Sequence, residues 1–214
     1  MSARRFSPLD NIIMNIDQGV RTVFGKPDVT ERANPADKSP ENEMSEANKK
    51  LSIGLMRVNH SGEVAAQALY QGQALTARDS ATKEQMQRSA QEEFDHLDWC
   101  EKRVKELGGH TSYLNPLWYA GSLTIGAMAG AIGDKWSLGF VVETEKQVGK
   151  HLEEHLGLLP GNDDKSRAVL KQMDIDEAEH AVKAQKAGAA ELPPPIKTLM
   201  KLTSKAMTKT AYRI

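Results

Sequence analysis

Apolar residues recur every three or four positions through most of the chain after residue 45, a spacing typical of amphipathic helices. Gly108-Gly109, Pro160-Gly161 and the three prolines at 193–195 interrupt this pattern with residues that end helices. No run has the alternation and flanking turns of a strand. The chain is therefore predicted to be all-α, with four long helices of bundle length. Helices are predicted over residues 46–78, 80–107, 134–158, 164–188 and 195–212, with an apolar helical segment near 116–132.

The first 45 residues have a different character. A short amphipathic helix is predicted, with Ile12, Ile13, Ile16, Val20 and Val23 on one side. The next stretch, "KPDVTERANPADKSPENEMSE", is polar, contains three prolines and lacks periodicity, so it is predicted to be an exposed linker. We therefore divide the chain into an N-terminal arm and linker, residues 1–45, and a helical domain, residues 46–214.

An acid interrupts the apolar stripe of the helix predicted at 80–107. Glu93 stands three residues after Ala90 and four before Leu97, where the spacing calls for an apolar side chain. His96 follows three residues later, on the same side of the helix and one turn along. This Glu-x-x-His pair is expected to point into the bundle.

The helix predicted at 164–188 repeats the motif. Glu177 lies four residues after Met173 on the apolar stripe, and His180 lies three residues after Glu177. Glu179 is about 200° away from Glu177 around the helix and points elsewhere.

The other two long helices each carry one inward acid. Glu63 stands midway between Met56 and Tyr70, seven residues from each. Glu145 completes the stripe of its helix and is preferred to Glu143, which lies two residues off it. The intervals from Glu63 to Glu93 (30 residues) and from Glu145 to Glu177 (32 residues) indicate two similar helical hairpins.

Four carboxylates in one core need compensation, because burying a single unpaired charge costs several kcal/mol. Two divalent cations would balance the four charges, and mixed Glu and His ligands suit iron or manganese. One Glu from each of two helices and Glu-x-x-His from two others is the donor set of ferritin-like di-iron bundles. The alternative, a bundle with a few buried Glu–His hydrogen bonds, leaves too many acids inside.

Composition excludes several function classes. Acidic and basic residues nearly cancel, 29 against 28, which argues against a nucleic-acid partner. Cys100 is the only cysteine, so a disulfide or thiolate cage cannot form within one chain, and we interpret it as core. The N-terminus shows no secretory signal.

Three segments raise the question of a membrane. The amphipathic N-terminal stretch would dock on lipid or on the bundle. Residues 117–133 are uncharged and rich in glycine and alanine, but too weakly apolar to predict a spanning helix. They would suit a helix that lines an apolar channel, lies at the bilayer surface, is buried in the core or forms a dimer interface. A basic stripe on the last helix suits either solvent, which is slightly favoured, or anionic lipid. Its residues are Lys197, Lys201, Lys205, Lys209 and Arg213.

The blocks "RVNHSGEVAAQALYQGQ", "EEFDHLDWCEKRV", "VVETEKQVGKHLEEHL", "DEAEHA" and "AYRI" resemble the 5-demethoxyubiquinone hydroxylases of ubiquinone biosynthesis, over about residues 46–214. The resemblance implies a ferritin-like di-iron monooxygenase, with two Fe ions, peripheral on the cytoplasmic side of the inner membrane. It would use O₂ to convert a polyprenyl 5-demethoxyubiquinol to 3-demethylubiquinol. The family's metal positions map onto Glu63, Glu93, His96, Glu145, Glu177 and His180.

Further roles are less direct. The resemblance implies that His151 lies near the substrate, but Leu152 replaces the tyrosine that follows in animal members. Tyr70 is expected near the metal ions or simply in the core. One of Asp95, Asp98 and Asp176 is expected to orient a metal-bound imidazole. His60 is interpreted as a core residue, and His110 and His155 as surface or loop residues.

Two competing functions remain open at this point: a di-iron quinol oxidase, and a bacterioferritin-like iron store. Protein partners from the same pathway and a homo-oligomer also remain open.

Overall fold

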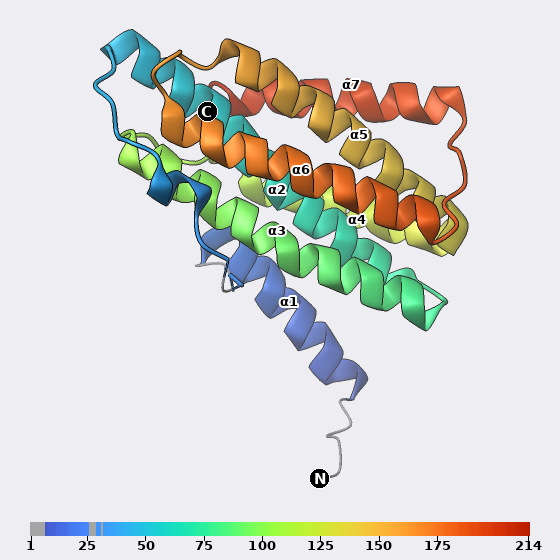
Figure 1. Cartoon of the computed structure of the whole chain (residues 1–214). Coiled ribbons are helices and arrows are strands. Elements are labelled where there is room, and N and C mark those ends of the chain that lie inside the picture. Colours follow the sequence, from blue (N-terminus) through green and yellow to red (C-terminus); the bar gives the residue numbers. More distant parts are fainter. Residues whose placement is uncertain (1–6, 26–28, 31) are drawn as a thin grey trace.

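The computed structural model describes residues 7–25, 29–30 and 32–214, which contain seven α-helices and no strand (Figure 1). The six helices predicted from residue 46 onward are confirmed, and their ends agree within two residues. The elements are α1 (Pro8–Phe24), a 3₁₀ helix η1 (Pro35–Lys38), α2 (Glu46–Thr76), α3 (Ser80–Glu106), α4 (Asn115–Ile132), α5 (Asp134–Leu158), α6 (Asp164–Lys186) and α7 (Pro194–Ala211).

Two helical hairpins, α2–α3 and α5–α6, form a four-helix bundle (Figure 1). Helix α4 connects them and lies along α2, and α7 crosses the outside of α2 and α5. Side-chain caps fix the starts of three bundle helices: Ser45 accepts from Asn48 N, and Asp79 and Asp163 cap α3 and α6 in the same way. Three of the four bundle helices therefore begin where polar cap residues stand in the chain.

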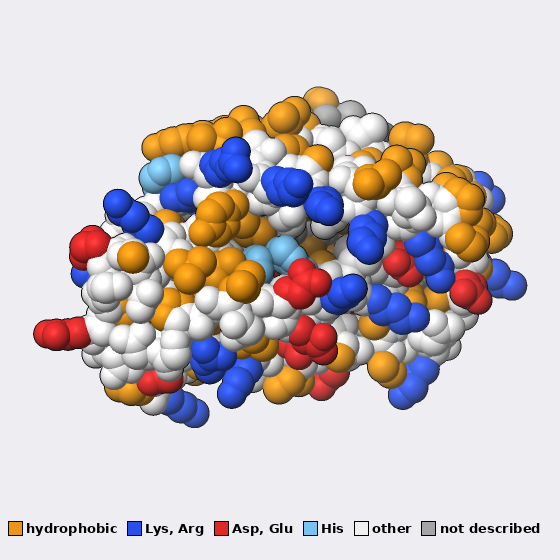
Figure 2. All heavy atoms as spheres, turned by 90° about the horizontal axis from the view of Figure 1, so that it is seen from above, with side chains coloured by type: hydrophobic (Ala, Val, Ile, Leu, Met, Phe, Trp, Pro, Cys, Tyr) orange, Lys and Arg blue, Asp and Glu red, His pale blue; other side chains and the backbone are white. Residues whose placement is uncertain are grey.

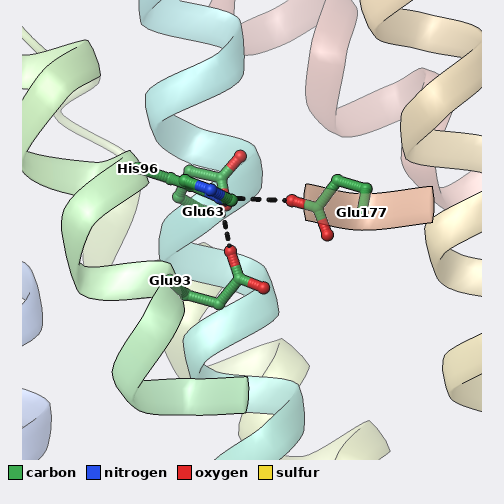
Figure 3. Close-up of side chains that lie close together, drawn as sticks. All are labelled: Glu63, Glu93, His96 and Glu177. Atoms are coloured by element: carbon green, nitrogen blue, oxygen red, sulfur yellow. Dashed lines mark hydrogen bonds and ion pairs between the residues drawn. The ribbon is translucent and has the colours of Figure 1, made fainter. Parts of the chain in front are cut away.

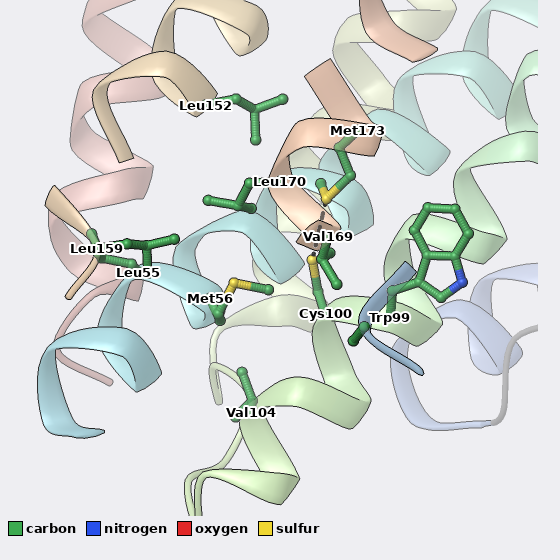
Figure 4. Close-up of a cluster of buried hydrophobic side chains, with 11 residues drawn as sticks. Leu55, Met56, Trp99, Cys100, Val104, Leu152, Leu159, Val169, Leu170 and Met173 are labelled. Carbon is green, nitrogen blue, oxygen red and sulfur yellow. Dashed lines mark hydrogen bonds between the residues drawn. The ribbon is translucent and has the colours of Figure 1, made fainter. Parts of the chain in front are cut away.

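Apolar layers close the bundle on either side of its middle. One layer, drawn in Figure 4, joins all four bundle helices through residues such as Met56, Cys100, Leu152 and Met173. The other joins the same four helices through Tyr70, Met86, Leu138, Val141 and Ala184. Cys100 is fully buried, with its Sγ 3.7 Å from the Sδ of Met173, so the prediction that it belongs to the core is confirmed. The inward acids lie along the helices between these layers.

Helix α4 packs closely on α2 through glycines. A Cβ atom on Gly126 would lie 2.2 Å from the carbonyl oxygen of Leu69, and one on Gly72 would lie 2.3 Å from that of Leu123. The opposite side of α4 leaves Leu117, Met128 and Ile132 exposed. The small residues predicted near 117–133 therefore serve close helix packing on one side, while the other side is an apolar surface.

The prediction of an exposed linker before α2 holds for most of its residues but misses its contacts with the bundle. Residues 29–30 and 32–45, which we call the strap, lie across α3 and α6, with Ala36 and Met44 buried (Figure 1). Arg103 binds Glu41 of the strap at 2.8 Å, and Asn42 donates to Asp164 at 2.7 Å. A polar stretch was read as solvated because polarity alone does not distinguish side chains in water from side chains paired with the bundle.

The amphipathic helix predicted near the N-terminus is confirmed as α1. It contacts α2 and α4, with Asn15 accepting a hydrogen bond from Gln71 and Gly19 lying against Tyr119. Ile16 and Val20 of its apolar side nevertheless remain exposed. The side chain of Ile12 lies outside the described residues.

Replacing Gly126 with Ala is expected to destabilise the protein by about 1–3 kcal/mol, because the added methyl group collides with the α2 backbone. The matched control is Gly121→Ala in the same helix, where a Cβ atom meets nothing within 4 Å. That change should be neutral or stabilise by up to about 1 kcal/mol. Urea unfolding of both variants measures the difference, and equal stabilities would contradict the close packing.

Candidate metal centre

The six predicted site residues come together in the middle of the bundle. Glu63 from α2, Glu93 and His96 from α3, and Glu177 from α6 form one group of four potential metal ligands (Figure 3). A second group combines Glu93 and Glu177 with two further residues, Glu145 from α5 and His180 from α6. In each group one ligand atom per residue lies within 4.8 Å of the others. All six side chains are buried, and Glu93 and Glu177 belong to both groups.

Each imidazole turns its Nδ1 atom toward the carboxylates. His96 Nδ1 lies 2.9 Å from Glu93 Oε2 and 3.3 Å from Glu177 Oε1. His180 Nδ1 lies 3.1 Å from Glu177 Oε2 and 3.2 Å from Glu93 Oε1. The two Glu-x-x-His pairs therefore face one another across α3 and α6, with an oxygen-rich space between them.

The outer nitrogen of each imidazole binds an acid on the opposite helix. His96 Nε2 lies 2.8 Å from Asp176 of α6, and His180 Nε2 lies 2.6 Å from Glu92 of α3. Each acid immediately precedes the glutamate of a Glu-x-x-His motif, so the arrangement is reciprocal. A carboxylate in this position fixes the tautomer and orientation of a metal-binding imidazole.

Sequence reasoning found one of these two acids. Asp176 is one of the three aspartates predicted to orient an imidazole, whereas Glu92 was not predicted. A usable signal was present, because an acid precedes the glutamate of both motifs. The other two candidates pair elsewhere: Asp95 accepts from Thr30, and Asp98 binds Lys102 of its own helix.

The remaining predicted residues fall into different places. Tyr70 is buried and donates its hydroxyl hydrogen bond to Glu145, so it adjoins the second group. His151 is half-buried, and its ring lies 3.9 Å from the ring of His155. The prediction that His155 is a surface residue is wrong: it is buried, and its Nδ1 lies 2.9 Å from Asn59 Oδ1. Its position was misjudged because it lies beside the acids of "HLEEHL".

Two other histidines lie where they were expected. His60 is buried near Asn115, and burial lowers its pKa to about 4. His110 is exposed in the connection between α3 and α4. Neither contributes to the two groups of ligands.

The site is strongly coupled electrostatically. Burial, and then the neighbouring carboxylates, raise the pKa of Glu63 and Glu145 well above the usual range. Burial alone would lower the pKa of His96 and His180, but the surrounding carboxylates outweigh it and raise both values. Burial would raise the pKa of Asp176, yet hydrogen bonds from His96, Arg32 and other donors hold it at about 2.

These residues fit a pair of divalent cations. The Glu93 Oε1 atom is buried and lies 3.2 Å from His180 Nδ1, but it accepts no hydrogen bond of good geometry within the described part of the chain. Four carboxylates and two imidazoles give mixed oxygen and nitrogen ligands, which suit iron. The two outer acids complete the support that metal-bound histidines usually have.

Removing metal with a chelator should make stability fall as pH rises from 7 to 9. An unfolded chain has already lost these protons at pH 7, because free His and Glu titrate near pH 6.5 and 4.3. The folded site keeps them longer, since the pKa values of Glu63, Glu145, His96 and His180 are raised. The folded state binds more protons than the unfolded state over this range. Its free energy of unfolding should therefore fall by on the order of 1 kcal/mol for each unit that the pH rises.

The measurement is urea unfolding of the chelated protein at pH 7, 8 and 9, with the iron-loaded protein as control. Metal replaces the protons in the loaded protein, so its dependence on pH should be weaker. The charge coupling would be contradicted if the chelated protein gained stability over this range.

Three comparisons place the chain among known proteins. The family model described as "Ubiquinone biosynthesis protein COQ7" matches residues 50–211. A 3-demethoxyubiquinol 3-hydroxylase of Nitrosococcus oceani is 59% identical over 214 residues, covering 100% of both chains. One of Chromobacterium violaceum is 55% identical over 206 residues, covering 96% of this chain and all of the relative. A dodecameric thioferritin, the bacterioferritin-related protein from Bacteroides fragilis, has a similar fold, with a TM-score of 0.55 and 20% identity over 64% of this chain and 84% of that one.

Proposed function

Because the chain belongs to the ubiquinone biosynthesis protein COQ7 family, we propose that it catalyses the reaction for which its relatives are named, the 3-hydroxylation of 3-demethoxyubiquinol. The product would be 3-demethylubiquinol, and O₂ would supply the new oxygen atom. The observation that carries this proposal is the pair of buried ligand groups that share Glu93 and Glu177. Membership of the family adds the identity of the quinol substrate.

Two iron ions are the proposed cofactor. Glu63 and His96 would hold one ion and Glu145 and His180 the other, with Glu93 and Glu177 shared between them. Bound iron supplies the redox chemistry that activates O₂ for transfer of one oxygen atom to an aromatic ring. The second oxygen atom would leave as water. Its reduction would consume two electrons from a reductant and two protons.

The protein's own contribution is to hold these ligands and keep water away. Asp176 and Glu92 keep each imidazole turned with Nδ1 inward. The apolar layers on either side exclude solvent, which strengthens the electrostatic interactions inside. Tyr70 holds Glu145 by a hydrogen bond, so this carboxylate is restrained from both the α2 and the α5 side.

We place the quinol ring beside Tyr70, at the seam between α2 and α5. A small recess there is lined by Leu69, Phe140, Val141 and Glu145 as well as Tyr70. It offers apolar contact for a ring next to the second ligand group. The recess holds only about 10 Å³, so side chains must move for the ring to enter.

His151 is the second residue proposed to lie near the substrate. It stands six residues after Glu145 on α5, about 9 Å along the helix axis. Its Nε2 atom is buried and has no hydrogen-bond partner among the described residues, so it is free to bind a polar group of a substrate.

A sharp test uses iron-reconstituted protein, a reductant, ¹⁸O₂ and a short-chain 3-demethoxyubiquinol. Mass spectrometry should find one ¹⁸O atom in the ring of the product, and Glu177→Ala should lose iron and product formation together because it removes a shared ligand. The control Glu179→Ala changes an exposed acid two residues away and should behave as wild type.

The alternatives give different results. A quinol oxidase would place all ¹⁸O in water, and an iron store would continue to take up iron beyond two ions per chain. Either result would contradict the hydroxylase assignment. Retention of two ions per chain by Glu177→Ala would contradict the ligand assignment.

We also propose that the protein binds a membrane surface, which for this family we place on the cytoplasmic side of the inner membrane. Within the described residues, no helix is both long and apolar enough to cross a bilayer. Helix α4 carries no charged residue and exposes Leu117, Ile125, Met128 and Ile132. An exposed apolar surface of this kind suits attachment at the interface.

Neighbouring surfaces support this attachment. An apolar groove of about 570 Å³ lies between α1, α2 and α4, lined by residues such as Ile16, Val20, Leu75 and Leu123. On the side where α7 lies, Lys and Arg side chains form a row bordered by hydrophobic side chains (Figure 2). Exposed Lys201, Lys205 and Lys209 lie on α7, and such cations attract anionic lipid.

Replacing Met128 with Glu should weaken binding to vesicles that contain anionic lipid by about tenfold or more, because burial of a Met side chain contributes about 1.5–3 kcal/mol. Vesicle sedimentation measures the bound fraction. The control Leu158→Glu changes a similarly exposed side chain, 58% against 63%, at the far end of α5. Equal loss of binding in both variants would exclude α4 as the contact surface.

A further inference from the structure

The strap connects α1 to α2 by a path over the two helices that carry the Glu-x-x-His motifs (Figure 1). At one end, Thr30 donates to Asp95 of α3 through its backbone N–H, at 2.7 Å, and through its hydroxyl. At the other end, Asn42 donates to Asp164 of α6. The strap therefore ties α3 to α6 from outside. The whole strap lies before residue 50, where the match to the family model begins.

Arg32 is a strap residue that contacts the surroundings of the metal centre. Its guanidinium forms an ion pair with Asp176 and lies 3.8 Å from the buried Asp95 carboxylate. The same group stands 5.0 Å from the centre of the Trp99 ring, a cation–π contact. Three different groups on α3 and α6 thus hold one arginine side chain.

Arg32 is one step removed from a proposed metal ligand. The Asp176 Oδ2 atom that accepts from Arg32 also accepts from His96 Nε2, while Asp176 Oδ1 accepts from Gln172 at 2.9 Å. Asp176 is only partly buried, so loss of Arg32 would remove one of the three contacts that hold its carboxylate in place. The chain of contacts Arg32–Asp176–His96 then ends at the ligand group that contains Glu63.

Among the described residues, the strap makes no hydrogen bond or ion pair with the acid that supports the second imidazole, although the Arg32 charge also attracts Glu92. Glu92, the partner of His180, receives a weaker contact of 3.4 Å from Lys183, an exposed residue of α6. This lysine lies on the same helix as His180 and does not belong to the strap. The outer support of the two imidazoles is therefore unequal.

We propose that Arg32 is a positioning residue of the metal centre, which holds Asp176 against His96 and thereby lets the strap control how firmly one metal ion is bound. The proposal rests on the metal centre proposed above, but not on the identity of the organic substrate. Arginine suits this position because its planar group can pair with a carboxylate while it stacks on an indole ring.

The test measures metal binding directly. Arg32→Gln should release one Fe²⁺ ion to a chelator about three to ten times faster than wild type, a smaller effect than the about 10- to 100-fold loss of affinity typical when the direct partner of a metal-bound histidine is removed. With Co²⁺ as a spectroscopic probe, the d–d absorption bands should also change for one of two bound ions. Arg32→Lys keeps the charge without the planar group and should recover part of both effects.

Two control variants separate positioning from general loosening of the strap. Asn42→Ala removes the contact with Asp164 at the far end of the strap, and Lys38→Gln removes an exposed strap cation that has no ion pair among the described residues. Both should keep the wild-type release rate and Co²⁺ spectrum.

The outcomes are distinguishable. If Arg32→Gln keeps the wild-type rate and spectrum, or if Asn42→Ala changes them equally, the positioning role is wrong while the proposed enzyme stands. If the wild-type chain binds neither Fe²⁺ nor Co²⁺, the metal centre itself is wrong and this role falls with it.

Discussion

Four carboxylates are buried within a few ångströms of one another, and the rest of the structure has to offset the free-energy cost of burying their charge. Burial, and then like charges at such distances, raise the pKa values of Glu63 and Glu145, while the two imidazoles offset part of the negative charge. Protons or metal ions must supply the remainder. Apolar layers are common to helical bundles. Here they also keep water from solvating the carboxylates, so the negative charge has to be balanced by bound cations.

The fold was readable from the sequence because helical periodicity and helix-ending residues are local signals. The same periodicity revealed the site, since each inward acid appears as a gap in an apolar stripe. It also separated Glu145 from Glu143: the structure buries Glu145 in the second ligand group, whereas Glu143 accepts a hydrogen bond from Gln147 of its own helix. Whether these side chains bind iron is a prediction that metal analysis has to test.

The features that sequence reasoning missed depend on contacts between distant segments. Glu92 supports His180 from 88 positions away in the sequence, so the acid before each motif glutamate is visible locally but its partner histidine is not. The strap was missed for a related reason: Arg32 is a charged residue in a proline-containing polar stretch, and its partner Asp176 lies 144 positions along the chain. Periodicity reports which way a side chain points, but it does not report what lies opposite.

The symmetry of the ligands contrasts with the asymmetry of their surroundings. Each hairpin supplies one Glu and one Glu-x-x-His, yet the group that contains His96 lies under Trp99, Arg32 and the strap, while the group that contains Glu145 adjoins Tyr70 and the recess at the α2–α5 seam. The recess beside Tyr70 is the side that we propose for the quinol, because the strap lies across α3 and α6 beside the other group. The asymmetry thus favours different tasks for the two proposed metal positions: one would be supported from outside by the strap, and the other would face the substrate.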